Sequence, residues 1–233
     1  SAVVSMVSHE LRTPLTSILG FAKLIDKRLE RIDSAQPPET MAQVAQNVQI
    51  IIAEGERLMS LINNVLDLAK IESGKAEWYM EPLAIDEIIE QAAVATGSLL
   101  TSDSVAFRVK IEDQLPPVIG DRDRLVQVMV NLISNAVKFT EEGTITCEAA
   151  REDAHIIVRV IDTGVGIAPE DHEKVFEQFV QVGNLPKSDQ PAGSGLGLPI
   201  CQEIIEHHGG RLWVESALGE GSTFSFTLPL AKD

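Results

Sequence analysis

Apolar residues in the first third of the chain recur in alternating steps of three and four. This spacing places them along one side of a helix, so it predicts two long amphipathic helices. The first stripe is Val4, Val7, Leu11, Leu15, Ile18, Ala22, Ile25, Leu29 and Ile32, and the second is Met41, Val44, Val48, Ile51, Gly55, Leu58, Ile62, Val65 and Ala69. A loop is expected over residues 33–40, where Pro37 and Pro38 interrupt a helix and Ser34 and Thr40 are capping residue types.

Two antiparallel helices leave about half of each stripe in contact with water. Pairing with a second copy of the chain would cover that surface by forming a four-helix bundle. The pattern therefore predicts an all-α helical hairpin that forms a dimeric four-helix bundle, and we expect a homodimer through this hairpin.

The rest of the chain has a different pattern of apolar residues, in which strand and helix spacings are mixed. Ser73 and Gly74 are expected to end the second helix. Runs rich in β-branched residues predict strands over residues 105–111, 144–151, 155–162, 211–216 and 222–228, with a loop over 114–120. A 3.6-residue period predicts helices over residues 85–100 and 198–207. It also predicts a helix that begins after Asp121, which is a capping residue type. Because helices and strands do not alternate regularly, the fold class is an α+β two-layer sandwich with a largely antiparallel or mixed sheet.

These patterns divide the 233 residues into a hairpin over 1–73, a hinge over 74–82 and an α+β domain over 83–233.

A net charge of −16 argues against a nucleic-acid partner, which requires clustered Lys and Arg. Cys147 and Cys201 stand alone, and we expect both to be reduced packing residues. No apolar run reaches the length of a membrane span. We therefore expect a cytoplasmic location, with membrane contact only through segments outside this sequence.

His9 lies on the side of the first helix that faces away from the apolar stripe. Two positions separate it from Val7 and two from Leu11, and at about 100° per residue its ring points away from both. A surface imidazole is mostly neutral at cell pH, so one ring nitrogen is free to attack an electrophile. Glu10, the next residue, is placed to orient the ring or take its proton. The alternative is an ordinary solvated helix face, and the rest of the chain decides between the two.

Three clusters in the second region combine polar groups with glycine. Asn131, Asn135 and Lys138 stand at i, i+4 and i+7 on one helix face, where amide oxygens suit Mg²⁺ and a lysine suits phosphate. Residues 162–167, Asp-Thr-Gly-Val-Gly-Ile, follow a strand, and their glycines allow a ligand to approach the backbone. Residues 193–198, Gly-Ser-Gly-Leu-Gly-Leu, lead into a helix whose first amides suit an anion. The sequence has neither a Rossmann nor a P-loop fingerprint, so a nucleotide site here is of another kind.

With these motifs in this order, the chain resembles the transmitter region of two-component sensor histidine kinases. That region joins a dimerisation and phosphoacceptor hairpin to a catalytic ATP-binding domain of the Bergerat (GHKL) type. Residues 8–15 are similar to the H box, 131–140 to the N box, 162–167 to the G1 box, 176–179 to the F box and 193–198 to the G2 box. The resemblance covers nearly the whole chain.

The resemblance implies a role for each matching residue. His9 would accept the γ-phosphoryl group of ATP, with Glu10 as the acid and base beside it, and Thr13 would position a water for dephosphorylating the partner regulator. Asn135 would ligate Mg²⁺, and Asp162 would accept a hydrogen bond from the exocyclic amine of adenine. The nucleotide-binding residues implied are Asn131, Asn135, Lys138, Phe139, Asp162, Gly164, Gly166, Ile167, Gly193, Ser194, Gly195, Leu196, Gly197, Leu198 and Thr223.

The same resemblance implies ATP and Mg²⁺ as cofactors and a lid over residues 180–192, in which Lys187 is an additional phosphate contact. The neutral imidazole would attack the γ-phosphorus in line, and the phosphoryl group would then pass to an aspartate of a response regulator receiver domain. Action as a phosphatase of that regulator is also expected.

Two other classes of protein compete with this interpretation. ATP hydrolases of the gyrase, mismatch-repair and heat-shock chaperone kind resemble the second region, but they carry a glutamate in the N box to activate water. Asn131 stands at that position here, so hydrolysis is expected to be slow. A docking module without catalysis is the other class, and the presence of His9, Asn135 and Asp162 argues against it.

Overall fold

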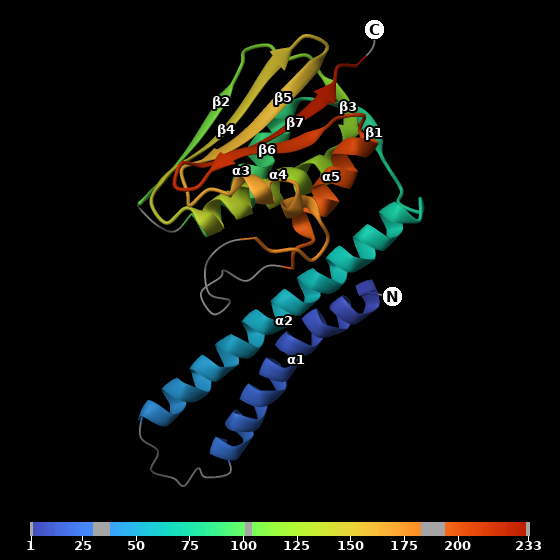
Figure 1. The fold of residues 1–233 in the computed structure, drawn as a ribbon. Helices are drawn as coiled ribbons and strands as arrows, with labels where there is room; N and C mark the ends of the chain where they lie inside the picture. Colours follow the sequence, from blue (N-terminus) through green and yellow to red (C-terminus); the bar gives the residue numbers. More distant parts are fainter. Residues whose placement is uncertain (1, 30–37, 101–103, 183–193, 232–233) are drawn as a thin grey trace. The chain divides into compact units, whose positions relative to one another are not determined.

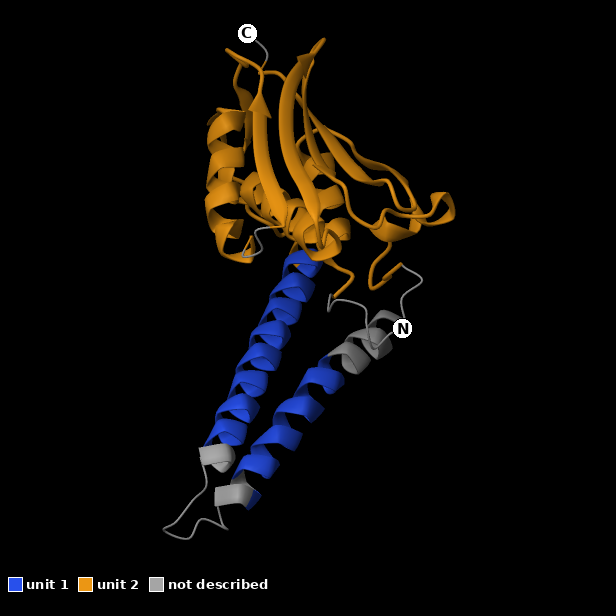
Figure 2. Cartoon of the chain, turned by 90° about the vertical axis from the view of Figure 1, so that its left-hand side faces the viewer, with its two compact units in different colours: residues 1–69 blue, residues 70–233 orange. Residues whose placement is uncertain are grey.

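The computed structural model gives the fold of residues 2–29, 38–100, 104–182 and 194–231 (Figure 1). Side chains are described for all of these except residues 2–10, 26, 28, 29 and 38–40. The chain forms two compact units, residues 1–69 and residues 70–233 (Figure 2). Within the described residues, no helix is both long enough and apolar enough to cross a membrane.

The two long helices predicted from the apolar stripes are confirmed. α1 spans Ala2–Leu29 and α2 spans Pro38–Glu72. Thr40 does not cap the second helix, because α2 already begins at Pro38. Proline is favoured at the first helical position, where its fixed φ fits and its missing N–H is not needed. Ser34 and most of the predicted loop lie outside the described residues.

α2 ends where the sequence predicted. Its last residue is Glu72, and Gly74 has a φ of 65°, the left-handed conformation that terminates many helices. The N–H of Gly74 donates to the carbonyl of Ile71 at 2.9 Å.

The most buried positions on α2 are not those of the predicted stripe. Leu61, Leu68 and Asn47 are 2%, 6% and 8% exposed, whereas Val48 and Ile62 of the predicted stripe are exposed. α2 carries apolar residues on two adjacent faces, and a three-and-four pattern read from sequence does not show which face packs inside the hairpin.

The sandwich contains a five-stranded sheet in the order β2-β4-β5-β7-β6. Its strands are β2 (Val105–Ile111), β4 (Gly143–Glu152), β5 (His155–Asp162), β6 (Leu212–Ala217) and β7 (Gly221–Pro229). β2 pairs parallel with β4, and the other neighbours pair antiparallel, so the predicted mixed sheet is confirmed.

Three helices cover one face of this sheet (Figure 1). They are α3 (Ile85–Thr96), α4 (Arg122–Phe139) and α5 (Gly197–His207), and the short 3₁₀ turns are Gly97–Leu99, Pro169–Asp171 and Lys174–Phe176. Asp121 caps α4 as predicted, because its carboxylate accepts the N–H of Arg124 at 3.1 Å. Aliphatic residues from both layers form the core, among them Ile89, Met129, Leu132, Ile156, Ile200 and Leu228.

Both cysteines lie in this core with free thiols. Cys147 and Cys201 are fully buried, and burial raises the pKa of each thiol to about 12. A thiol of such high pKa is almost entirely protonated at neutral pH and is a weak nucleophile, as the prediction of reduced packing residues requires.

Two short strands were not predicted from the sequence. β1 (Met80–Leu83) pairs antiparallel with β3 (Val118–Asp121), and Pro82 stands opposite Ile119. Each strand has four residues, which is too short for a clear alternation, and proline argues against a strand. Part of the predicted loop over 114–120 is therefore strand, and three residues of the predicted hinge, 80–82, are paired inside the second unit.

Candidate nucleotide-binding site

The polar face of α4 is arranged as its sequence spacing predicts. Leu132 and Ile133 are fully buried against the sheet, while Asn131, Asn135 and Lys138 are half-buried on the opposite side. The ammonium of Lys138 lies 4.9 Å from the centre of the Phe139 ring. α4 therefore presents two amides and one cation along a single stripe that ends at Phe139.

Asp162 is a buried acidic residue that two backbone hydrogen bonds hold in place. It ends β5 and is 6% exposed, and its Oδ1 accepts the N–H of Gly164 at 2.8 Å and that of Ser222 at 3.2 Å. Burial raises the pKa of this carboxyl group, and the two backbone hydrogen bonds offset only part of that rise. Its Oδ2 receives no hydrogen bond from the residues that the structure describes, so one oxygen is fixed and the other is available to a donor.

The loop that follows Asp162 lies directly on the end of α4. The N–H of Val165 donates to the carbonyl of Phe139 at 3.2 Å. A Cβ on Gly164 would stand 2.2 Å from that same carbonyl oxygen, so no larger residue fits there without moving the backbone. This contact brings the predicted adenine-binding aspartate beside the predicted phosphate-binding helix.

The glycine-rich segment before α5 lies beside the amide face of α4. A Cβ placed on Gly197, the first residue of α5, would be 3.4 Å from Oδ1 of Asn131. The hydroxyl of Ser194 accepts the N–H of Leu196 at 3.3 Å, and Leu196 is fully buried. The helix N-terminus predicted to face an anion is thus next to the amide face of α4.

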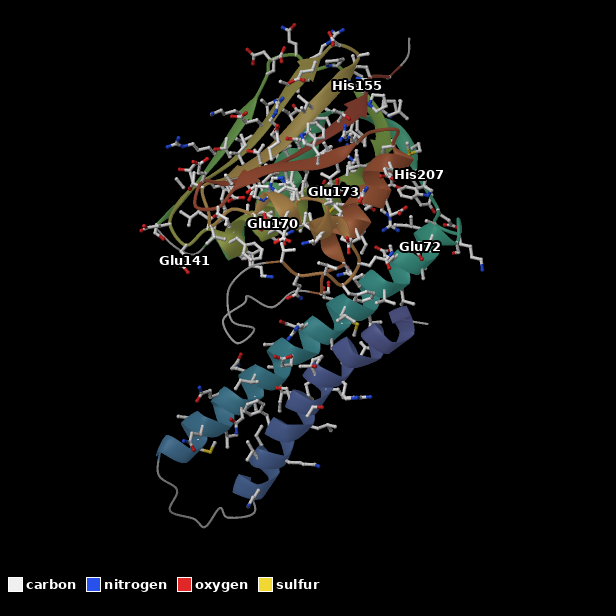
Figure 3. The ribbon with its side chains drawn as sticks, in the orientation of Figure 1. Glu72, Glu141, His155, Glu170, Glu173 and His207 are labelled. Atoms are coloured by element: carbon white, nitrogen blue, oxygen red, sulfur yellow. The ribbon has the colours of Figure 1, made fainter. Side chains whose placement is uncertain are left out.

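The F-box segment contacts the glycine-rich segment before α5 and strand β7. The N–H of Phe179 donates to the carbonyl of Gly195 at 2.9 Å, and the ring of Phe176 meets the ring of Phe224 edge to face at 6.4 Å. Gln178 Nε2 donates to Oε1 of Glu72 at 2.8 Å, and Figure 3 labels Glu72 at the end of α2.

The remaining predicted residues are described in part. Thr13 is exposed on α1, and Thr223 is half-buried on β7 next to Ser222. Gly166, Ile167 and Leu198 are half-buried in the loop after β5 and the first turn of α5. The side chains of His9 and Glu10, Gly193 and the lid residues from 183 onward, Lys187 included, lie outside the described residues.

Two serines that the sequence did not predict also belong to this site. Ser222 provides a backbone N–H to Asp162, and Ser216 accepts the N–H of Ile167 at 2.7 Å. Ser222 follows Gly219-Glu220-Gly221, and each serine lies at an end of the alternating buried positions of its strand, Ser216 after Val214 and Ser222 before Phe224. These local patterns do not show which residues the serines contact. Their contribution depends on strand register, which places both in line with Asp162.

An anchored carboxylate, an amide-bearing helix face and a helix N-terminus meet on one side of a two-layer sandwich that follows a helical hairpin. Together they define a nucleotide-binding domain joined to a two-helix module. Residues 1–74 match the family model of the His Kinase A (phospho-acceptor) domain, and residues 120–232 match that of the histidine kinase-, DNA gyrase B- and HSP90-like ATPases.

Individual proteins and solved structures similar to this chain are also histidine kinases. The circadian input-output histidine kinase CikA of Synechococcus elongatus is 34% identical over 97% of this chain, and the chain spans 29% of its length. Full-length ShkA, solved in complex with AMPPNP, is 30% identical over 100% of this chain and 46% of its own, with a TM-score of 0.71. The catalytic domain of the histidine kinase ThkA is 30% identical over 65% of this chain and 95% of its own, with a TM-score of 0.57. ThkA in complex with the response regulator protein TrrA is 27% identical over 99% of this chain and 62% of that chain, with a TM-score of 0.74. The chain belongs to the sensor histidine kinase family.

Proposed function

We propose that this protein transfers the γ-phosphoryl group of ATP to His9 and then to an aspartate of a response regulator. The observation that carries the proposal is Asp162, one of whose oxygens is fixed by Gly164 and Ser222 while the other is available to a donor. ShkA, of the same family, was solved with the ATP analogue AMPPNP, and ThkA was solved with a response regulator.

Asp162 accounts for a preference for adenine. A carboxylate oxygen accepts a hydrogen bond from the exocyclic amine of adenine, whereas guanine presents a carbonyl oxygen at the corresponding position, which a carboxylate repels. Because the carboxylate is buried, a repulsive or unpaired contact there is not relieved by water. Thr223, next to Ser222, is placed to assist through a water molecule.

The amide face of α4 suits a magnesium triphosphate. Mg²⁺ usually keeps several waters and takes one or two protein oxygens plus phosphate oxygens, so the single amide of Asn135 is a sufficient protein ligand. The described residues contain no group of three His, Cys, Asp or Glu side chains that could hold a metal without phosphate. Asn135 would hold the ion, which offsets phosphate charge when bound, while Asn131 and Lys138 lie along the same stripe.

The reaction at His9 follows from the chemistry of neutral imidazole. A ring nitrogen attacks the γ-phosphorus, a P–N bond forms, the bond to the bridging oxygen breaks, and ADP leaves. Glu10 takes the proton that the ring loses. The resulting phosphohistidine then gives its phosphoryl group to a regulator aspartate. Thr13, one turn further along α1, would position water for the reverse function, dephosphorylation of that regulator.

The exposed apolar side chains of the hairpin support a dimer. Leu15, Leu19 and Leu24 of α1 and Met41, Val48, Ile52, Met59, Ile62 and Leu66 of α2 are all exposed in a single chain. The six on α2 recur at spacings that place them along one face of that helix, and monomeric proteins rarely leave such an apolar stripe in water. A second copy would cover it in a four-helix bundle. Since ATP is the phosphoryl donor, we place both units in the cytoplasm.

The test uses γ-labelled ATP with Mg²⁺. The chain should become labelled, and the label should be lost in acid and kept in base, as a phosphoramidate requires. His9→Gln should bind ATP but take up no label, whereas Asp162→Asn should bind ATP about 100-fold more weakly and take up no label when ATP is well below saturation. Release of free phosphate without labelled protein would favour a hydrolase instead, and no turnover at all would favour a docking module.

A further inference from the structure

We infer that Ser216 is a positioning residue for the adenine end of the nucleotide site. Its hydroxyl joins the loop after β5 to the hairpin formed by β6 and β7. The inference rests on the proposed function, since it takes Asp162 as the group that recognises adenine.

Three polar residues stand in a row across three adjacent strands. Asp162 on β5 is paired with Ser222 on β7, and Ser222 is in turn paired with Ser216 on β6. The row lies at one end of all three strands, where β5 leads into the loop of residues 163–167 and the hairpin between β6 and β7 turns. Strand pairing alone therefore places Ser216 next to Ser222, the residue whose backbone N–H donates to the Asp162 carboxylate.

The hydroxyl of Ser216 makes three hydrogen bonds, and their geometry fixes its proton. It donates to the carbonyl of Gly221 at 2.7 Å, and it accepts the N–H of Ile167 at 2.7 Å. The third partner is the hydroxyl of Ser222 at 3.0 Å. Since Ser216 has one proton and gives it to Gly221, Ser222 is the donor in this last bond. Every donor and acceptor site of the Ser216 hydroxyl is used.

The loop that Ser216 holds lies in close contact with the β6–β7 hairpin. The N–H of Gly219 donates to the carbonyl of Val165 at 2.8 Å. Gly166 has a φ of 70°, and a Cβ on it would stand 1.9 Å from the carbonyl oxygen of Ala217. The loop and the hairpin thus form one block, and Ser216 supplies the side-chain bond between them.

This block fixes the orientation of Asp162. The two N–H groups that bind Oδ1 come from Gly164, in the loop, and from Ser222, in the hairpin. Removing the Ser216 hydroxyl would leave the N–H of Ile167 without its acceptor and free the hydroxyl of Ser222. The two donors would then no longer be held at one separation, and the free oxygen of Asp162 would lose its fixed direction toward adenine.

The experiment measures nucleotide affinity and autophosphorylation kinetics of the full chain. Ser216→Ala should bind ATP and ADP about tenfold more weakly, and by the same factor, because the lost hydrogen bond acts at the base and not at the phosphates. KM for ATP should rise by a similar factor, while kcat at saturating ATP stays within about twofold of the starting protein. Ser216→Thr, which keeps the hydroxyl, should restore most of the affinity.

Ser225→Ala is the matched control. Ser225 lies on β7, is fully buried, and its hydroxyl has no hydrogen-bond partner among the described residues, so its removal should leave ATP affinity unchanged. ATP binding by Ser216→Ala at the strength of the unchanged protein would overturn the positioning role. So would a lowered kcat at unchanged KM, or a failure of Ser216→Thr to restore binding. If the unchanged protein binds no ATP, the proposed function itself fails.

Discussion

The indole of Trp78 stacks on the imidazole of His207, with the ring centres 3.8 Å apart and the planes 12° from parallel. His207 is the last residue of α5 (Figure 3), and Trp78 belongs to the segment between α2 and β1. The guanidinium of Arg124 lies 5.8 Å from the indole centre, and the backbone N–H of Tyr79 donates to Asp121 at 2.9 Å. The end of the linker is therefore fastened to the second unit before β1 begins.

This fastening predicts the effect of replacing Trp78. Trp78→Ala should lower the free energy of unfolding of the second unit by about 2 kcal/mol, because a large apolar surface and a stacked pair are lost. It should also speed proteolytic cleavage between residues 74 and 80. Denaturant unfolding followed by circular dichroism, together with limited proteolysis, checks both effects. Trp78→Phe keeps a ring for stacking and should lie between the two. Unchanged stability and cleavage in Trp78→Ala would show that the stack does not hold the linker.

The neighbouring His208 makes the stability of the second unit depend on pH. Its Nε2 accepts the N–H of Asp121 at 2.9 Å, and its Nδ1 lies 2.7 Å from the carbonyl of Ile204, so the ring is neutral with its proton on Nδ1. Burial lowers the pKa of His208 below its usual value. The unfolded state therefore binds a proton more readily. Stability from this group is fully present above about pH 6.5 and is lost as the pH falls through the folded pKa.

Unfolding free energies measured from pH 8 to pH 5 test this coupling. His208→Phe should be less stable at pH 8, because the N–H of Asp121 loses its acceptor, and its stability should fall less between pH 7 and pH 5. His207→Gln changes an exposed neighbouring imidazole and should keep the steeper fall. Equal slopes for the unchanged protein and His208→Phe would contradict the assignment.

Asp162→Asn should separate stability from binding. Burial raises the pKa of this carboxyl group, so its charge costs stability at neutral pH, and the neutral amide should make the second unit more stable. The NH₂ group of the new amide would face the exocyclic amine of adenine, so two donors would meet without an acceptor. ATP affinity should therefore fall about 100-fold. Thermal unfolding and equilibrium binding of ATP measure the two effects. A variant that is destabilised, or that still binds ATP as tightly as before, would contradict the role given to Asp162.

Asn47 offers a test of the hairpin. It is 8% exposed, and its Nδ2 donates to none of the described residues. Asn47→Leu should stabilise α2 by about 1–2 kcal/mol, since an unsatisfied buried amide is replaced by an apolar group of similar size. Asn47→Asp should act in the opposite direction. Hydrogen exchange of the α2 amides reports on each variant, and slower exchange in Asn47→Asp than in Asn47→Leu would refute the expectation.

Much of the fold was readable from the sequence because strong local patterns coincide with packing. β2 and β5 have the predicted limits, Asp121 caps α4, and Gly74 follows the end of α2. β1 and β3 were missed because four-residue strands carry little periodicity, and Pro82 argues against a strand. The positions of α2 that pack inside one chain, Leu61 and Leu68, were not identified, because two apolar faces on one helix give overlapping patterns.

The site was predictable where function needs a particular residue type in a fixed local spacing. Asn131, Asn135 and Lys138 share a face because 3.6 residues make a turn, and this depends on no distant residue. Ser216 and Ser222 stand about fifty and sixty residues after Asp162 in sequence, and the register between β5, β7 and β6 that brings them together is set by the whole sheet. The stacking of Trp78 on His207 is likewise a product of tertiary packing.

The measurement that bears most directly on the central claim is to locate the phosphoryl group on the chain after incubation with ATP and Mg²⁺. Tandem mass spectrometry of peptides kept at alkaline pH should find a single modified residue, His9, in the unchanged protein, and none in Asp162→Asn. Phosphate on a serine, threonine or different histidine, or modification of His9 that persists at the same level in Asp162→Asn, would contradict the claim that the nucleotide site of the second unit serves His9.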